Sequence, residues 1–163
     1  MASTGIAPAQ APNRTLIGPL STQAGFQYWY LVCLPDSIIA VRQSITAFFM
    51  FGLSNGAAAP IHGLLGALIH QLIGGQARAF RERTETNLQR TAISWLRAKP
   101  NAVYPVSQLK SIAFKNSKAG GNLILPDIVL HSMNGAQQKY GVQRPDFDKA
   151  CLQLKQLYPH LCQ

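Results

Sequence analysis

Acidic residues are scarce in this chain. Six Asp and Glu residues stand against 15 Lys and Arg, which gives a formal net charge of +9. Catalysis by paired carboxylates therefore has few candidates, because only Glu82 and Glu85 lie close together on one expected helix and arginines flank both. A strongly basic surface instead favours contact with lipid phosphates, nucleic acid or an acidic partner.

Metal, nucleotide and hydrolase motifs are also missing. Cys33, Cys151 and Cys162 are far apart and form no CxxC or Cys/His pattern of the kind that a zinc site needs. The glycine pairs at 74–75 and 120–121 lack the spacing of a phosphate-binding loop, so we expect turns there. We predict no enzymatic activity, no cofactor, and no catalytic or metal site. The cysteines are expected to be free thiols in a reducing compartment.

The first residues contain no basic start followed by an apolar run, the pattern of a secretory signal, and this predicts a cytoplasmic location. Residues 1–25 are rich in Pro, Ala, Ser and Thr, and we expect a flexible arm there. Residues 26–163 are long enough for one domain with its own core.

Charge is absent from one long segment, which runs from position 43 to position 77. Within this segment, apolar residues recur at the spacing of one helix face, namely at Ile61, Leu64, Leu65, Leu68, Ile69, Leu72 and Ile73. A basic and helical stretch follows from Gln76 to Arg97, with a packing stripe at Phe80, Thr84, Leu88 and Ala92 and then Ile93, Trp95 and Leu96. We therefore predict a helical insertion over residues 44–100.

Strands are predicted on both sides of this insertion. Aromatic and β-branched residues at 27–34 and 37–43 flank the turn Pro35-Asp36 and indicate a hairpin. Further strands are expected at 103–106, 109–115, 122–131 and 136–142, the last two joined at Asn134-Gly135. A closing helix is predicted from Asp146 to Tyr158, with its sheet-facing side formed by Phe147, Cys151, Leu154 and Tyr158.

This pattern resembles the pleckstrin-homology-like (PH-like) domains of bacteria. The resemblance rests on residues 30–41, 106–112, 121–125 and 135–140, and the Gly- and Ala-rich segment 52–75 resembles a helical insert found in such proteins. It implies an α+β fold: an antiparallel sheet or partly closed barrel, a C-terminal capping helix and an inserted helical hairpin. Two features depart from the family. The expected strands number five or six rather than seven, and the loop Pro35-Asp36-Ser37 lacks the basic residues that bind phosphoinositides.

The uncharged segment has three interpretations. A single membrane-spanning helix requires about 20 apolar residues, and here Ser54-Asn55-Gly56 and Pro60 interrupt the run. A shallow hairpin at the cytoplasmic membrane face agrees better with the basic residues on both flanks. In that hypothesis the apolar contacts are Phe48, Phe49, Phe51, Leu65, Leu68 and Leu72, and the phosphate contacts are Arg78, Arg81 and Arg83.

The third interpretation is a soluble structural subunit. In it the Gly- and Ala-rich helix docks on other protein subunits or on a second copy of the chain. Asn55, His62, His70 and Gln71 are polar groups that lipid would leave without hydrogen bonds and a protein partner could satisfy. Nucleic acid ranks behind an anionic membrane surface and protein subunits as a partner.

Overall fold

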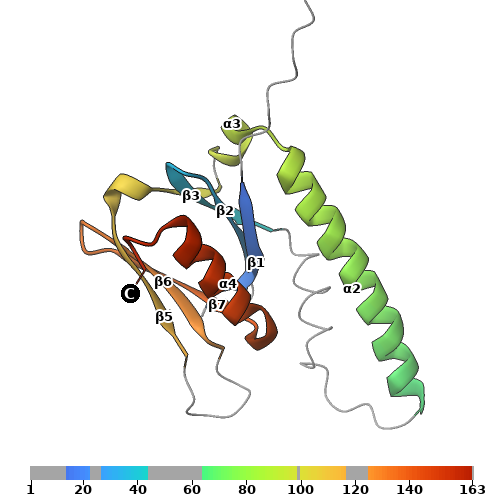
Figure 1. The fold of residues 1–163 in the computed structure, drawn as a ribbon. Coiled ribbons are helices and arrows are strands. Elements are labelled where there is room, and N and C mark those ends of the chain that lie inside the picture. The colour runs from blue at the N-terminus through green and yellow to red at the C-terminus, as the bar shows by residue number, and fades with distance from the viewer. Residues whose placement is uncertain (1–13, 23–26, 44–63, 99, 117–124, 163) are drawn as a thin grey trace, which may run out of the picture.

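The computed structural model describes residues 14–22, 27–43, 64–98, 100–116 and 125–162. The fold is α+β, with a seven-stranded antiparallel open sheet of order β4-β3-β2-β1-β7-β6-β5, a C-terminal helix packed on it and an inserted helix (Figure 1). The strands are β1 (Thr15–Ser21), β2 (Tyr28–Cys33), β3 (Ser37–Arg42), β4 (Ala102–Pro105), β5 (Leu109–Lys115), β6 (Asp127–Ser132) and β7 (Gln137–Val142). The helices are α2 (Leu64–Arg90), α3 (Ile93–Leu96), α4 (Arg144–Leu157) and the short 3-10 turn η1 (Val106–Gln108).

Strand β1 corrects the expectation for the N-terminal arm. Residues 15–21 pair with β2 on one side and with β7 on the other, so this part of the expected arm lies inside the sheet. The strand accommodates Pro19 through an irregularity between Ile17 and Leu20, where the pairing register with β2 shifts. Residues 1–13 and 23–25 of the expected arm lie outside the described residues.

The two central strands β2 and β3 are buried on both faces. Trp29, Leu31 and Cys33 of β2 face the core that α4 covers, whereas the alternating residues Tyr30 and Val32 face α2 and α3. Side chains alternate between the two faces of a strand, so a strand between two helical layers needs an almost continuous apolar sequence. The predicted hairpin of residues 27–43 meets this requirement and is confirmed.

Helix α4 covers one face of the sheet, as predicted. Phe147, Leu154 and Tyr158 are buried in its core, and Cys151 packs partly against it. The Tyr158 hydroxyl donates a 2.6 Å hydrogen bond to the backbone oxygen of Leu34, in the loop after β2. This contact ties the end of the chain to the central hairpin.

The insertion between β3 and β4 differs from its prediction in three places. Ala92 of the predicted packing stripe is exposed, because α2 ends at Arg90 and a new helix begins at Ile93. Gly74 and Gly75 form no turn, because α2 continues through both of them. Trp95 does not pack, since its side chain is 76% exposed, while Leu96 beside it is buried. The first helix of the expected helical hairpin and the glycine pair 120–121 lie outside the described residues.

Candidate docking site on helix α2

The C-terminal half of α2 packs on the sheet. Ala77 and Leu88 are buried, and Leu88 and Phe80 contact the second core cluster, which includes Tyr30 of β2 and Ile39 of β3. The predicted stripe is therefore correct for Phe80 and Leu88. This contact fixes which side of α2 faces the sheet.

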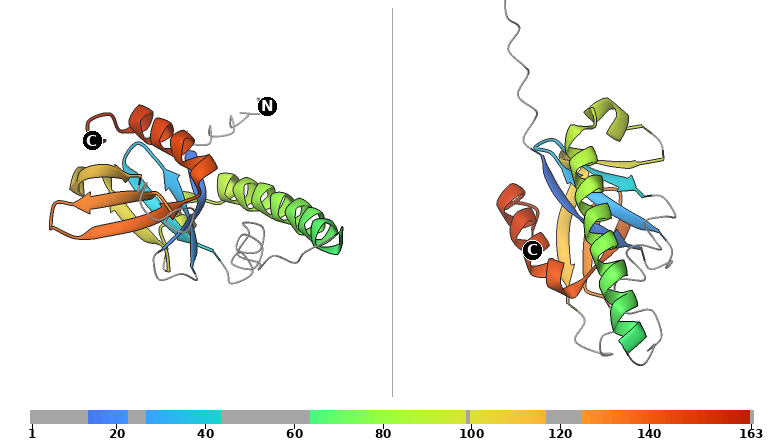
Figure 2. Two further views of the ribbon diagram at one scale, coloured as in Figure 1. Left: turned by 90° about the horizontal axis from the view of Figure 1, so that it is seen from below. Right: turned by 90° about the vertical axis from the view of Figure 1, so that its right-hand side faces the viewer.

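The N-terminal half of α2 extends beyond the sheet. Figures 1 and 2 show this half of the helix extending away from the strands. Gly75 is exposed, and a Cβ atom at this position would have no neighbouring atom within 4 Å. From Leu64 to Gly75 a rise of about 1.5 Å per residue gives an arm of roughly 18 Å. We call residues 64–75 the arm.

Four of the apolar positions of the arm do not continue the sheet-facing side of the helix. Successive α-helical positions lie about 100° apart around the axis. By this geometry, positions 65, 68, 69 and 72 are centred roughly 120° from the sheet-facing positions 77, 80 and 88. The sequence carries Leu or Ile at all four. These four positions thus lie on a side of α2 that the sheet does not cover, whereas Ile73, four residues before Ala77, lies on the sheet-facing side.

The three arginines that follow the arm have different environments. Arg78 and Arg83 are exposed, and Arg83 follows Leu72 by eleven residues, which is about three turns, so it lies on the same side of α2 as the apolar positions. Arg81 instead forms ion pairs with Glu85 and with Asp146 of α4. The guanidinium of Arg81 is therefore already bound within the chain, and its predicted role as a phosphate contact stays a prediction.

The other predicted contact residues divide into two groups. The backbone positions of Leu65, Leu68 and Leu72 lie on the arm. Phe48, Phe49 and Phe51 lie outside the described residues. The structure therefore places the backbone of the second group only, and the contact role of both groups stays a prediction.

Arg14 anchors the far end of α2, a role that the sequence did not predict. Its Nη1 atom donates hydrogen bonds of 2.7 and 2.8 Å to the backbone oxygens of Leu88 and Thr91. Carbonyl groups in the last turn of a helix lack partners within the helix, and a cation there is favourable. The signal in the sequence is an Arg directly before a Thr-Leu-Ile run, but this run lies within residues 1–25, whose composition favours a flexible N-terminal segment.

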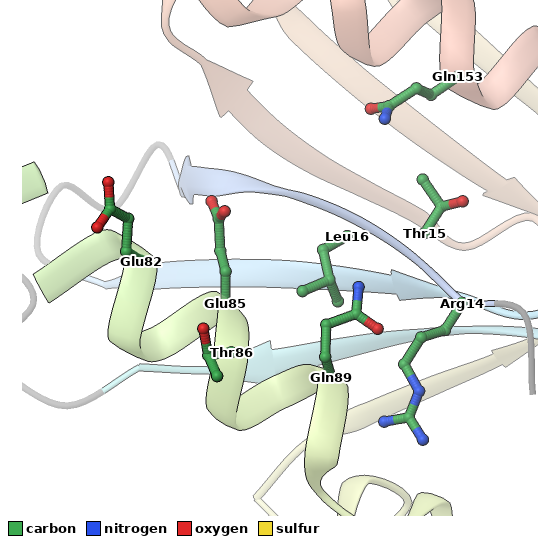
Figure 3. A pocket seen from close by; sticks show the side chains of 8 residues that line it. All are labelled: Arg14, Thr15, Leu16, Glu82, Glu85, Thr86, Gln89 and Gln153. Atoms are coloured by element: carbon green, nitrogen blue, oxygen red, sulfur yellow. The ribbon is translucent and has the colours of Figure 1, made fainter. Parts of the chain in front are cut away.

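A polar groove lies between α2 and α4, with β1 as its floor (Figure 3). It encloses about 460 Å³ and is lined by Arg14, Thr15, Leu16, Glu82, Glu85, Thr86, Gln89 and Gln153. The guanidinium of Arg14 is bound to helix carbonyls and the carboxylate of Glu85 is bound to Arg81.

The thiols lie in apolar surroundings. Burial raises the pKa of Cys33 to about 12, and it also raises the pKa values of Cys151 and Cys162. A thiol with a raised pKa stays protonated at neutral pH and is a poor nucleophile. Among the described residues, no three His, Cys, Asp or Glu side chains come together as ligands for a metal ion.

No helix in the described ranges is both long enough and apolar enough to cross a bilayer. No protein-family model matches the chain, and no curated protein or solved structure shows significant similarity to it.

Proposed function

We propose that this protein is a non-enzymatic, peripheral membrane module, in which the arm of α2 docks in an anionic membrane surface. The sheet and α4 form a PH-like body that carries the arm. The arm enters one leaflet and does not span the bilayer, because roughly 18 Å of helix is shorter than the ~30 Å hydrocarbon core.

The observation that carries this proposal is the position of the apolar residues on the arm. Leu65, Leu68, Ile69 and Leu72 lie on the half of α2 that extends away from the strands, on a side about 120° from the side packed on β2 and β3. Burial of a Leu or Ile side chain contributes about 1.5–3 kcal/mol, so an apolar surface of this kind favours an apolar environment outside the sheet.

The charges next to the arm favour lipid over a neutral protein surface. Arg78 and Arg83 are exposed at its base, and the four arm positions from Leu65 to Leu72 share one side of the helix with Arg83. An apolar surface that ends in cations is typical of interfacial helices, whose basic residues contact lipid phosphates. The net charge of +9 adds attraction to an anionic membrane.

The PH-like body supports the proposal through its architecture and restricts where lipid binds. A seven-stranded antiparallel sheet followed by a helix that packs on it is the arrangement that the resemblance implied. Its β2–β3 loop has no basic cluster, and its acidic residue Asp36 forms a 2.7 Å ion pair with Arg97. The lipid contact is therefore assigned to the arm and not to this loop.

Flotation with vesicles of phosphatidylglycerol and phosphatidylcholine tests the proposal. We expect the native protein to float and Leu68→Asp to lose roughly a hundredfold in affinity, because an acidic side chain costs about 3 kcal/mol in an apolar helix environment. Leu152→Asp is the matched control. Leu152 is an exposed leucine on α4, 58% accessible, and its replacement should leave flotation unchanged.

Two outcomes would contradict membrane docking. One is flotation of Leu68→Asp at the native level. The other is failure of the native protein to float while light scattering shows a discrete oligomer that detergent does not dissociate. The second outcome would identify the arm as a protein-docking helix of a structural subunit.

A further inference from the structure

Arg81 lies where α2 leaves the sheet, and it contacts three separate elements. Its Nε atom is 2.9 Å from Glu85 Oε1, on the next turn of α2. Nη1 and Nη2 donate to the two carboxylate oxygens of Asp146 at 3.1 and 3.3 Å, in the first turn of α4. Nη2 also donates a 2.9 Å hydrogen bond to the backbone oxygen of Gly18 in β1. We call these contacts the Arg81 bridge.

The bridge is well defined chemically. A guanidinium that binds both oxygens of a carboxylate has a fixed relative orientation, which a single ammonium contact cannot impose. Burial would lower the pKa of Arg81, but the hydrogen bonds to Asp146 and Glu85 outweigh it and raise this pKa, so the charge persists at all accessible pH values. The Arg81 side chain is 34% exposed, so solvent only partly screens the contacts.

The backbone of β1 is shaped to accept this contact. Gly18 lies at the register shift in β1, and a Cβ atom there would be 2.6 Å from Cδ1 of the Tyr30 ring. Any larger residue would push β1 away from β2 and displace the oxygen that Arg81 binds. On the arm side of Arg81, the nearest buried residue of α2 is Ala77, which provides little packing surface.

We infer that Arg81 is a positioning residue that holds the arm of α2 at a fixed direction relative to the sheet and α4. This inference rests on the proposed function, because it explains how the half of α2 that extends away from the strands presents one side to a membrane. Arg78 and Arg83 contact the lipid phosphates, whereas Arg81 acts only through the direction of the helix. Apparent affinity falls in proportion to the correctly oriented fraction, so loss of the bridge weakens docking without removing a lipid contact.

Distance measurements on the lipid-free protein test the inference directly. Spin labels at Gln76→Cys on the arm side of α2 and Lys110→Cys on β5 report the direction of the helix, in a background where Cys151 and Cys162 are Ser and buried Cys33 remains. We expect one narrow distance distribution for the native bridge and its loss in Arg81→Met. Arg81→Lys should restore it in part, because it keeps the charge but not the two-oxygen contact.

Arg90→Met is the matched control, since Arg90 is an exposed arginine on the same helix. It should leave the distance distribution unchanged. Asp146→Asn is the second test variant and should broaden the distribution from the α4 side. An unchanged, narrow distribution in both Arg81→Met and Asp146→Asn would overturn the inference, even if thermal unfolding shows that the variants are less stable.

Vesicle binding then separates this inference from the proposed function. If the arm docks in lipid, Arg81→Met should bind vesicles roughly tenfold more weakly when a tenth of the molecules keep the native direction. Broad distances with no vesicle binding by the native protein would sustain the bridge and refute membrane docking. Flotation of the native protein together with unchanged distances in Arg81→Met would support membrane docking and refute the positioning role of Arg81.

Discussion

The two halves of α2 form one continuous helix but differ in how they pack against the sheet. The half after Ala77 presents Phe80 and Leu88 to β2 and β3, and its exposed side is polar and charged. The half before Ala77 has no charge on any side and extends beyond the sheet, and its positions Leu65, Leu68, Ile69 and Leu72 are centred about 120° away from the sheet-facing side.

This difference shows that an apolar helix surface does not by itself define the core. If residues 64–75 were a core extension, their apolar positions would align with Leu88 and Phe80. The rotation separates the four positions from Leu65 to Leu72 from the sheet-facing side of the helix, to which Ile73 belongs, and under the proposed function these four positions form a second apolar surface. The Arg81 bridge lies at the boundary between them.

The largest expected effect lies on the packed half. Leu88→Ala should lower the free energy of unfolding by about 2–4 kcal/mol, because it removes a side chain that is 7% exposed and leaves a cavity against β2 and β3. Chemical denaturation measures this loss. The control Leu152→Ala alters an exposed leucine and should change the free energy by less than about 0.5 kcal/mol.

Leu68→Ala on the arm completes the comparison. It should also lie within about 0.5 kcal/mol of the native protein, because its position is on the side of α2 that the sheet does not cover. A loss as large as that of Leu88→Ala would merge the two halves into one core helix and remove the basis for a docking surface.

A smaller and opposite effect is expected at Gly75. This residue is exposed within a continuous helix and has open space where a Cβ atom would lie, so Gly75→Ala should stabilise the local helix by about 0.5–1 kcal/mol. Slower amide hydrogen exchange along residues 64–80 would show this.

Gly135→Ala is the contrasting control for Gly75. Gly135 also has open space, but its φ of +85° is unfavourable for alanine, and this substitution should destabilise the β6–β7 turn. Faster exchange in Gly75→Ala would mean that alanine disrupts the helix at this position. This is the result expected if α2 bends at its glycines, as a turn at the glycine pair would require.

Local patterns predicted those elements whose apolar pattern is complete within one short segment of the sequence. The β2–β3 hairpin follows from two apolar runs around Pro35-Asp36, and α4 follows from Phe147, Leu154 and Tyr158 at helical spacing. Strand β1 was missed because Gly18-Pro19 interrupts its apolar pattern, and only pairing with β2 and β7 makes it a strand.

Contacts between segments far apart in the sequence account for the other features that the sequence did not predict. Nothing in the spacing of Arg78, Arg81 and Arg83 shows that only the middle arginine meets a carboxylate 65 residues away. The exposed Trp95 has a similar cause: α2 ends at Arg90, where Arg14 binds its last carbonyls, and α3 begins a new helix with a different facing side. Charge and periodicity do not encode such contacts between distant segments.

The smallest expected effect concerns the end of the insertion, where it returns to the sheet. Hydrogen bonds from Arg97 and Ser37 lower the pKa of Asp36, so the Asp36–Arg97 pair stabilises the fold above the ordinary carboxyl pKa, and the contribution is lost as the pH falls through the lowered value. Both side chains are largely exposed, so Asp36→Asn should cost only roughly 0.2–0.5 kcal/mol at neutral pH.

The difference in stability between Asp36→Asn and the native protein should vanish in strong acid. Thermal unfolding from pH 7 downward measures it, and a difference that grows on acidification would place the stabilising charge elsewhere. The packed half of α2 contacts the sheet through Leu88 and Arg14. The Asp36–Arg97 pair is therefore expected to fix the end of the insertion and not the position of the helix.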